Sequence, residues 1–268
     1  MVKSPLRYPG GKSRAVSQIM PQIPLDTLEF REPFVGGGSI FFAVRALFKR
    51  QIKRYWINDL NHDLACFWRV AQSNMDELVK TVLSVKSQYA DRGRELYAYY
   101  KDENPNWTEF DLAVRFFVMN RITFSGVVDS GGYSQQAFDR RFTDSSIDRL
   151  QKVAYYLQQV EITEGDYQTL LEADGQNVFI FLDPPYWSAT QSKLYGKQGS
   201  LHTGFDHERF ANVVKSCHHR WLITYDDSEL IRELFEFAAV SEWELQYGMN
   251  NYKQGKADKG RELFIKNY

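Results

Sequence analysis

Apolar positions along the chain follow two spacings: short continuous runs and a helical period. Apolar runs bounded by turn residues predict strands ahead of Gly36, at 54–57, ahead of Asp166, and at 178–182, 221–225, about 240–247 and 262–267. Helical spacing predicts helices up to about Met20, from Ile40 to about Arg50, and at 64–70, 75–89, 94–100, 110–119, 147–157, 207–214 and 229–237.

The order of these elements predicts an α/β fold. Strand and helix alternate before residue 61 and after residue 161, which is typical of a parallel sheet, and the last two strands predict an antiparallel hairpin at its edge. The purely helical block between them is most simply a second domain. We therefore expect one domain from residues 1–61 and 161–268 and a helical domain from residues 62–160.

The strand at 178–182 is apolar throughout and ends abruptly in Asp183-Pro184-Pro185-Tyr186. The continuous apolar run predicts a strand that is buried on both faces. A proline fixes its own φ and keeps the residue before it extended, so the Asp183 carboxylate and the Pro184 carbonyl are held rigidly. They are presented at the edge where open α/β sheets bind ligands.

Two rigid acceptors beside an aromatic ring suit chemistry on the exocyclic amine of a base. The lone pair of such an amine is delocalised into the ring, and two acceptors that draw on its hydrogens localise it, while Tyr186 stacks on the base. The plainer alternative is a strand end with a Pro-Pro stop and a capping Asp.

Two glycine-rich segments offer close backbone approach to a ligand. In Tyr8-Pro9-Gly10-Gly11-Lys12 the spacing does not fit a phosphate loop; the glycines instead suit a ligand carboxylate, with a charge from Lys12 and a stacking face from Tyr8. A plain N-terminal turn is the alternative. The second segment, at 36–38, joins a short strand to a helix, and Asp59 follows at the end of the next strand. That position suits a ribose diol, or else an N-cap for a helix beginning near Asn61.

Composition narrows the class of protein only slightly. The chain has 268 residues, of which 43% are hydrophobic, and a net charge of −1, so nucleic-acid binding would depend on a local basic face. Cys66 and Cys217 lack metal-ligand spacing, and we assign no metal. No apolar run reaches the roughly 18 residues of a membrane span and the N-terminus lacks a signal-peptide pattern, so we expect a soluble, cytoplasmic protein.

Four motifs, in their order along the chain, resemble the Dam-like, or D12, class of DNA adenine-N6 methyltransferases. They are Tyr8-Pro9-Gly10-Gly11-Lys12, Glu32-Pro33-Phe34-Val35-Gly36-Gly37-Gly38-Ser39, Asn58-Asp59 and Asp183-Pro184-Pro185-Tyr186. Asn120-Arg121, with Gly126 beyond it, resembles the segment ahead of the family's DNA-recognition hairpin, and Arg261-Glu262-Leu263-Phe264-Ile265 resembles its last strand. The resemblance implies a Rossmann-like methyltransferase sheet with an inserted helical DNA-recognition domain.

The resemblance implies S-adenosyl-L-methionine as the cofactor. By position, Tyr8, Lys12, Asp59 and Asp183 contact it, and Asp166 accepts a hydrogen bond from its adenine amine. A turn or cap role is the alternative for Asp166. The walls of the site are implied to include Pro9, Gly10, Gly11, Glu32, Phe34, Gly36 and Gly38.

The resemblance also implies where DNA binds. Arg7 matches a family lysine that contacts DNA, and the polar, glycine-rich segment 128–142 carries side chains that can pair with base edges and phosphates, or else form a solvated loop. Val127-Val128-Asp129 departs from members that methylate GATC, so that target is not assigned. We expect DNA contacts from Arg7, Asn120, Arg121, Ser125, Tyr133, Gln135, Arg140, Arg141 and Lys256.

Two loops complete the expected site. The glycine-rich stretch 187–205 is expected to close over the flipped base and the cofactor. The basic stretch 253–261, which includes Lys256, is expected to contact phosphate, with a solvated turn as the alternative.

The implied reaction is direct methyl transfer to N6 of a flipped adenine in double-stranded DNA, with Asp183 and Pro184 as acceptors and Tyr186 stacked on the base. Cytosine N4 is the nearest alternative, although its enzymes more often carry Ser at the position of Asp183. A non-catalytic DNA-binding protein, or methylation of RNA or of a protein glutamine, are the remaining rivals. We expect a monomer without membrane contact, and a cognate restriction endonuclease stays open as a partner.

Overall fold

The structure is a computed structural model that describes residues 2–102, 104–189, 204–246 and 259–268. Most of the expected closing loop at 187–205 and of the basic loop at 253–261, including Lys256, lies outside these residues. Within the described ranges, no helix is long and apolar enough to cross a membrane.

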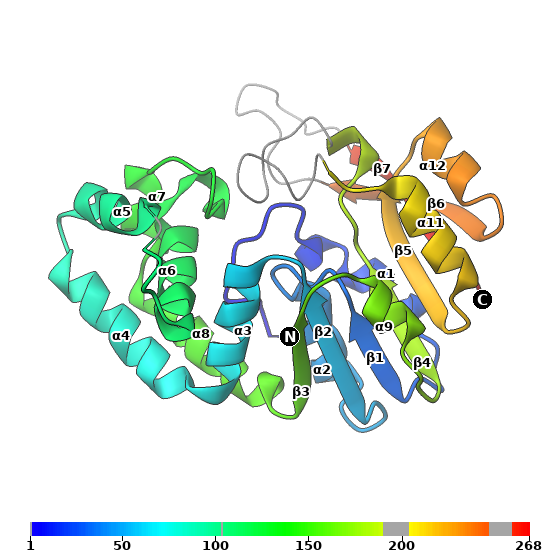
Figure 1. Cartoon of the computed structure of the whole chain (residues 1–268), viewed down its shortest axis with the longest axis horizontal. Coiled ribbons are helices and arrows are strands. Elements are labelled where there is room, and N and C mark those ends of the chain that lie inside the picture. Colours follow the sequence, from blue (N-terminus) through cyan, green and yellow to red (C-terminus); the bar gives the residue numbers. More distant parts are fainter. Residues whose placement is uncertain (1, 103, 190–203, 247–258) are drawn as a thin grey trace.

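One mixed sheet of seven described strands forms the centre of the molecule (Figure 1). In the order β3-β2-β1-β4-β5, neighbouring strands are parallel, while β7 runs antiparallel between β5 and β6. The predicted α/β class and the antiparallel edge are therefore confirmed. The strands are β1(Glu29–Glu32), β2(Arg54–Asp59), β3(Val160–Glu164), β4(Val178–Leu182), β5(Arg220–Asp226), β6(Ala239–Gln246) and β7(Lys259–Lys266).

The connections create a switch point between β1 and β4. From β1 the chain continues toward β2 and β3, whereas from β4 it continues toward β5 on the other side. The connecting segments therefore diverge at the carboxyl ends of these two strands, and a crevice opens where open sheets of this kind bind ligands.

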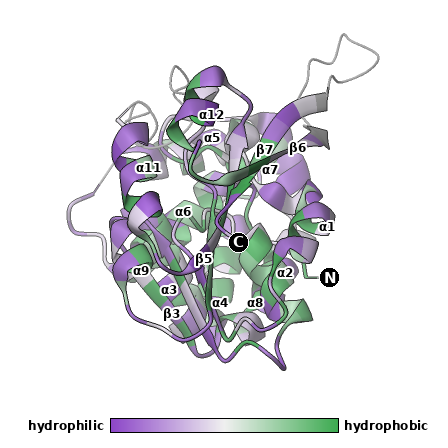
Figure 2. Ribbon diagram, turned by 90° about the vertical axis from the view of Figure 1, so that its right-hand side faces the viewer, coloured by the Kyte–Doolittle hydropathy of each residue, from purple (hydrophilic) through white to green (hydrophobic). Residues whose placement is uncertain are grey.

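Strand β4 is buried on both faces, as its apolar run predicted. Phe179 and Phe181 pack into the core on one face of the sheet, and Val178, Ile180 and Leu182 pack into the core on the other. Figure 2 shows the interior strands and helices as mainly hydrophobic and the outer turns as mainly hydrophilic. The second face is covered by α9(Gln168–Glu172), α11(His207–Ser216) and α12(Glu229–Leu234).

A helical block follows β2 and lies beside the β3 edge of the sheet (Figure 1). Its core is continuous with that of the first sheet face, because Phe42, Phe67 and Phe117 belong to one cluster. The division into residues 1–61 with 161–268 and residues 62–160 stays a prediction. The helices are α3(His62–Ser73), α4(Met75–Gln88), α5(Gly93–Lys101), α6(Glu109–Ile122), α7(Gln135–Arg141) and α8(Asp144–Leu157), with a 3-10 turn η3(Phe124–Gly126) after α6.

Two local predictions differ from the structure. The helix expected up to Met20 is a chain of short turns, η1(Lys12–Arg14), α1(Val16–Ile19) and η2(Met20–Gln22), with α2(Ser39–Leu47) as the next full helix. The segment expected as a polar loop at 128–142 contains α7, which Ser134 caps by accepting from the Ala137 N–H. The helix α7 buries only two apolar side chains, those of Ala137 and Phe138, which are too few for a helical period to be visible in the sequence.

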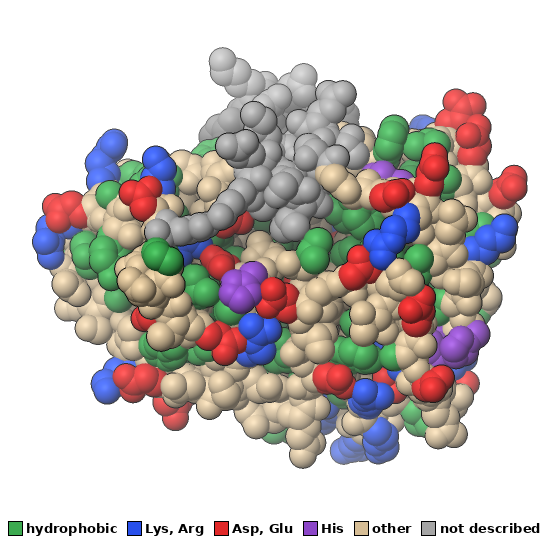
Figure 3. Space-filling model, viewed as in Figure 1, with side chains coloured by type: hydrophobic (Ala, Val, Ile, Leu, Met, Phe, Trp, Pro, Cys, Tyr) green, Lys and Arg blue, Asp and Glu red, His purple; other side chains and the backbone are tan. Residues whose placement is uncertain are grey.

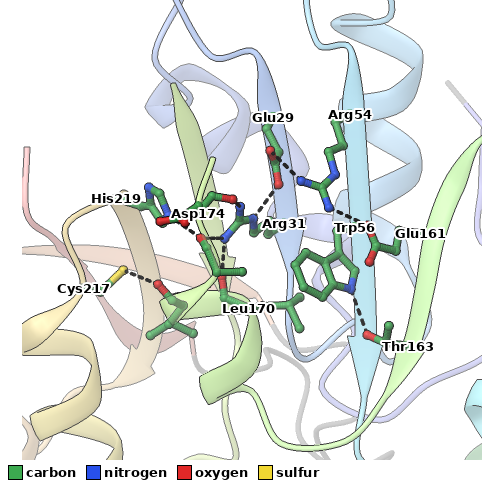
Figure 4. Close-up of polar contacts among 12 residues, drawn as sticks. Glu29, Arg31, Arg54, Trp56, Glu161, Thr163, Leu170, Asp174, Cys217 and His219 are labelled. Atoms are coloured by element: carbon green, nitrogen blue, oxygen red, sulfur yellow. Dashed lines mark hydrogen bonds and ion pairs between the residues drawn. The ribbon is translucent and has the colours of Figure 1, made fainter. Parts of the chain in front are cut away.

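A buried arginine of β1, Arg31, links α9 to the sheet through hydrogen bonds (Figure 4). Arg31 Nε donates to Glu29 Oε1 at 2.6 Å, and the guanidinium also donates to the carbonyls of Leu170, Ala173 and Asp174 at 2.7–2.8 Å. These carbonyls lie at the end of α9, where helix carbonyls lack intrahelical partners and a cation is favoured. The network thus fixes the segment that directly follows Asp166.

Candidate active site and cofactor cleft

A cleft of about 640 Å³ opens at the carboxyl ends of the central strands. This size lies within the range typical of small-molecule sites. Every residue that the sequence predicted for cofactor binding or catalysis lines it: Tyr8, Pro9, Gly10, Gly11, Lys12, Glu32, Phe34, Gly36, Gly38, Asp59, Asp166, Asp183, Pro184, Pro185 and Tyr186.

Glycines after β1 allow the backbone to pass close to Tyr8. Gly36 has a φ of +47°, and a Cβ there would lie 2.9 Å from ring carbons of Tyr8. Gly38, with a φ of +69°, precedes the first residue of α2. Both positions favour glycine because side chains rarely adopt this backbone conformation. The turn therefore brings the backbone against the Tyr8 ring in the wall of the cleft.

Asp59 is oriented by this turn. Its Oδ2 accepts from the Gly36 N–H at 2.9 Å and its Oδ1 from the Asn61 N–H at 3.0 Å. Burial raises the pKa of Asp59 to about 6, in spite of these hydrogen bonds. The N-cap alternative for Asp59 is wrong, because Asn61 caps α3 by accepting from the Leu64 N–H.

The end of the cleft at Asp183 and Tyr186, the candidate catalytic end, is a connected polar network. Lys12 Nζ lies 2.9 Å from Asp183 Oδ1 and 4.6 Å from the centre of the Tyr186 ring. Thr224 Oγ1 donates to the same Asp183 oxygen at 2.8 Å. The Tyr186 hydroxyl donates to Glu262 Oε2 at 2.7 Å.

Two acids near this network hold protons more tightly than usual. Burial raises the pKa of Glu32 well above its ordinary value, and the charges of Asp183 and Asp59 add to the rise. Burial likewise raises the pKa of Glu262 to about 7, although Lys12 and the Tyr186 hydrogen bond oppose the shift. A bound cation or hydrogen-bond donor would therefore favour ionisation of the carboxyl groups in and behind this end of the cleft.

Aromatic rings and an ion pair form the opposite end. The Phe34 ring lies 5.4 Å from Tyr167 and 5.9 Å from Phe205, measured between ring centres. Asp166 Oδ2 accepts from Arg209 Nη1 at 2.8 Å, and Oδ1 accepts from the Gln168 N–H at 2.9 Å. Burial would raise the pKa of Asp166, but these hydrogen bonds and the Arg209 charge outweigh it and lower the pKa.

Several residues of the site escaped the sequence interpretation. Tyr167, Phe205 and Arg209 line the aromatic end of the cleft, and Thr224 and Glu262 bind Asp183 and Tyr186 at its candidate catalytic end. Tyr167 adjoins the predicted Asp166, which was a usable signal. Phe205 belongs to the stretch 187–205 that was expected to close over the site, and Glu262 belongs to the motif at 261–265, but neither was named as a site residue. Arg209 and Thr224 come from segments that only the fold brings near the motifs.

The residues expected to contact DNA fall into two groups. Arg7, Gln135 and Arg140 are exposed, and Ser125, Tyr133 and Arg141 are half-buried. Asn120 and Arg121 are buried, contrary to what a direct DNA contact requires, and Lys256 is outside the described residues. On the face shown in Figure 3, acidic and basic side chains are interspersed, in line with the small net charge.

Asn120 and Arg121 have different surroundings. The Asn120 side chain accepts from the Arg7 N–H at 2.9 Å and donates to the carbonyls of Arg7 and Gly126 at 2.7 and 2.8 Å, so it links α6 to the N-terminal loop. Burial lowers the pKa of Arg121 to about 9, and the charges of Arg149, Arg7 and Arg141 add to the shift.

The fold places a carboxylate and an aromatic ring together at one end of a cleft, and comparison with known proteins gives the class of the protein. The model of the D12 class N6 adenine-specific DNA methyltransferases matches residues 8–249, and the chain belongs to this family. It is therefore a site-specific DNA methyltransferase that modifies N6 of adenine.

Three relatives illustrate the similarity. The type II methyltransferase M.MjaIII of Methanocaldococcus jannaschii is 30% identical over 202 residues, which cover 69% of each chain. The type II methyltransferase M.CviBI of Paramecium bursaria Chlorella virus NC1A is 26% identical over 276 residues and the full length of both chains. A DNA adenine methylase of Haemophilus influenzae is 24% identical over 274 residues, covering 96% of this chain and 91% of the relative.

Proposed function

We propose that the cleft holds S-adenosyl-L-methionine and that its catalytic end receives an adenine flipped out of double-stranded DNA. The observation that carries this proposal is the position of Asp183: its carboxylate stands at the end of the cleft, beside the Tyr186 ring, with Lys12 and Thr224 on one of its two oxygens.

The residues of the cleft fit the proposed cofactor. Asp59 offers a carboxylate to a ribose diol and is itself held by the Gly36 N–H. Phe34 and Tyr167 offer aromatic faces, with Asp166 as an acceptor for an adenine amine. When bound, the cofactor supplies an electrophilic methyl group.

The chemistry assigned to the chain follows from its acceptors. Asp183 and the Pro184 carbonyl accept hydrogens of the adenine N6 amine and localise its lone pair, while Tyr186 holds the plane of the base. Arg7, Gln135 and Arg140, which are exposed, are proposed to contact DNA. The protein is further proposed to act as a monomer in the bacterial or phage-infected cytoplasm.

The test is methylation mapping in a host that lacks DNA methylation, with a method that separates N6-methyladenine from N4-methylcytosine. We expect modified adenine in one short sequence. Asp183→Ala should abolish the mark, whereas Glu77→Ala, which removes a carboxylate on the exposed side of α4, should leave it unchanged. N4-methylcytosine, or a persistent mark in Asp183→Ala, would overturn the assigned roles.

A further inference from the structure

Two buried polar side chains outside the cleft touch its catalytic residues. Thr224 lies on β5 and is 0% exposed, and Glu262 lies on β7 and is 1% exposed. The two strands are paired, with Asp226 opposite Glu262 and Thr224 opposite Phe264. Neither Thr224 nor Glu262 lines the described cleft, so both lie behind the residues that meet the substrate.

Thr224 restricts the rotation of the Asp183 carboxylate. Its hydroxyl and the Lys12 ammonium both reach Oδ1, at 2.8 and 2.9 Å. In the described part of the chain, no donor reaches Oδ2. The two donors on one oxygen therefore leave the other as the acceptor for the hydrogen of an amine.

Glu262 restricts the Tyr186 ring in a similar way. The tyrosine hydroxyl is bound to the Glu262 carboxylate at 2.7 Å, and the ring lies 5.8 Å from that of Tyr225 with an angle of 33° between planes. A hydrogen bond at one end and a ring contact along the body fix the plane on which a base stacks.

We propose that Thr224 and Glu262 are positioning residues for methyl transfer, Thr224 by aiming Oδ2 of Asp183 at the target amine and Glu262 by fixing the ring plane of Tyr186. The proposal rests on the roles proposed above for Asp183 and Tyr186. In this proposal, the antiparallel strands at the edge of the sheet hold the catalytic residues in place.

The first test compares Thr224→Val with Thr224→Ser. Loss of a hydrogen bond to a charged group should lower kcat about tenfold to a hundredfold in Thr224→Val. Affinity for S-adenosylhomocysteine should stay unchanged, because the described cleft does not include Thr224. Thr224→Ser keeps the hydroxyl and should retain near-normal kcat. Equal rates in the two variants, or a loss confined to KM, would contradict the role of Thr224.

The second test is a double-mutant cycle with Tyr186→Phe. If Glu262 acts through the Tyr186 hydroxyl, Glu262→Ala should lower kcat about tenfold alone but cause no further loss in the Tyr186→Phe background. Additive losses would overturn the proposal. Should Glu262→Ala unfold in thermal melts, Glu262→Leu, which fills more of the space and also cannot accept from the hydroxyl, and its Tyr186→Phe double variant give the same cycle.

Different results would reject the positioning roles of Thr224 and Glu262 and the proposed function of the cleft. Activity of Asp183→Ala would remove the assigned catalytic role itself. Inactive Asp183→Ala together with full activity of Thr224→Val and Glu262→Ala would leave that role intact and reject only the positioning roles.

Discussion

We expect Asp59, which is proposed above to bind the ribose diol, to make cofactor affinity dependent on pH. Its pKa is raised to about 6, and the hydroxyls of a ribose would donate to the ionised carboxylate, so binding is coupled to loss of a proton. Affinity for S-adenosylhomocysteine should therefore increase as the pH rises through about 6 and then level off. Calorimetric titration between pH 5 and pH 8 measures this dependence.

Matched variants assign the dependence to one carboxyl group. Asp59→Asn should bind weakly and without the rise near pH 6. Asp166→Asn should keep the rise, because the pKa of Asp166 is lowered and that carboxyl is ionised throughout the range. A rise that persists in Asp59→Asn would assign the titration to another group.

Individual residues were predictable where the chemistry lies within one short motif. Asp183 and Tyr186 follow β4 directly, and the four motifs locate the cleft. Thr224 and Glu262 were not predictable, because their contacts depend on the pairing of β5 with β7 and on the approach of both to the end of β4. The burial of Asn120 was equally hidden, since α6 is buried almost all round over residues 113–122 and shows no exposed stripe.

Among the elements, the turn after α6 depends on a single glycine. Gly126 has a φ of +79°, and a Cβ there would lie 2.6 Å from the Arg7 carbonyl oxygen. Gly126→Ala should lower the free energy of unfolding by roughly 1–3 kcal/mol through strain and loss of the Asn120 contacts. Urea unfolding measures the change.

The neighbouring loop provides the control. Gly132 has open space around its Cβ position and does not require a positive φ, so Gly132→Ala should leave the free energy of unfolding nearly unchanged. Equal losses in both variants would show that the loop, and not the contact with Arg7, determines stability here. DNA binding should fall in Gly126→Ala alone, because only that change displaces the Arg7 backbone.

Elements with a clear apolar period were predicted well, whereas irregular ones were not. The strands and the long helices follow from the spacing of apolar residues, and α7 was missed because Ala137 and Phe138 give too short a pattern. The N-terminal turns escaped because Pro21 and the glycines before Lys12 limit helix length without fixing the turn type.

At the scale of the whole molecule, Glu262 makes the free energy of unfolding depend on pH. Its pKa is about 7 when folded and 4.5 ordinarily, so its contribution is fully present below about pH 4.5 and is lost as the pH rises through 7. The loss amounts to about 3 kcal/mol. His207 and His219 act in the opposite direction, because burial lowers their pKa values.

The difference in unfolding free energy between the wild type and Glu262→Gln isolates the contribution of Glu262. Relative to Glu262→Gln, the wild type without cofactor should lose stability between pH 5 and pH 7.5, while the histidine contributions cancel. Chemical unfolding at several pH values gives the difference. Parallel curves for the wild type and Glu262→Gln would be inconsistent with a raised pKa at this site.

For the whole molecule, the fold class and the order of the elements were predictable from the sequence, but the residues that share a hydrophobic core were not. The sheet with an antiparallel edge follows from the element order, yet the core that joins Phe42 of α2 to Phe117 of α6 could not be inferred from spacing. The small net charge carried no information on DNA binding, because charges of both signs are interspersed on the face shown in Figure 3.

The place of β7 between β5 and β6 has a consequence for synthesis. Both neighbours leave the ribosome before the strand that separates them, so each waits with an unpaired edge that other chains could join. Glu262 arrives on that same strand. Until β7 pairs with its neighbours, the nascent chain is prone to aggregate and Tyr186 lacks its hydrogen bond to Glu262. The pairing of β7 ends both conditions together.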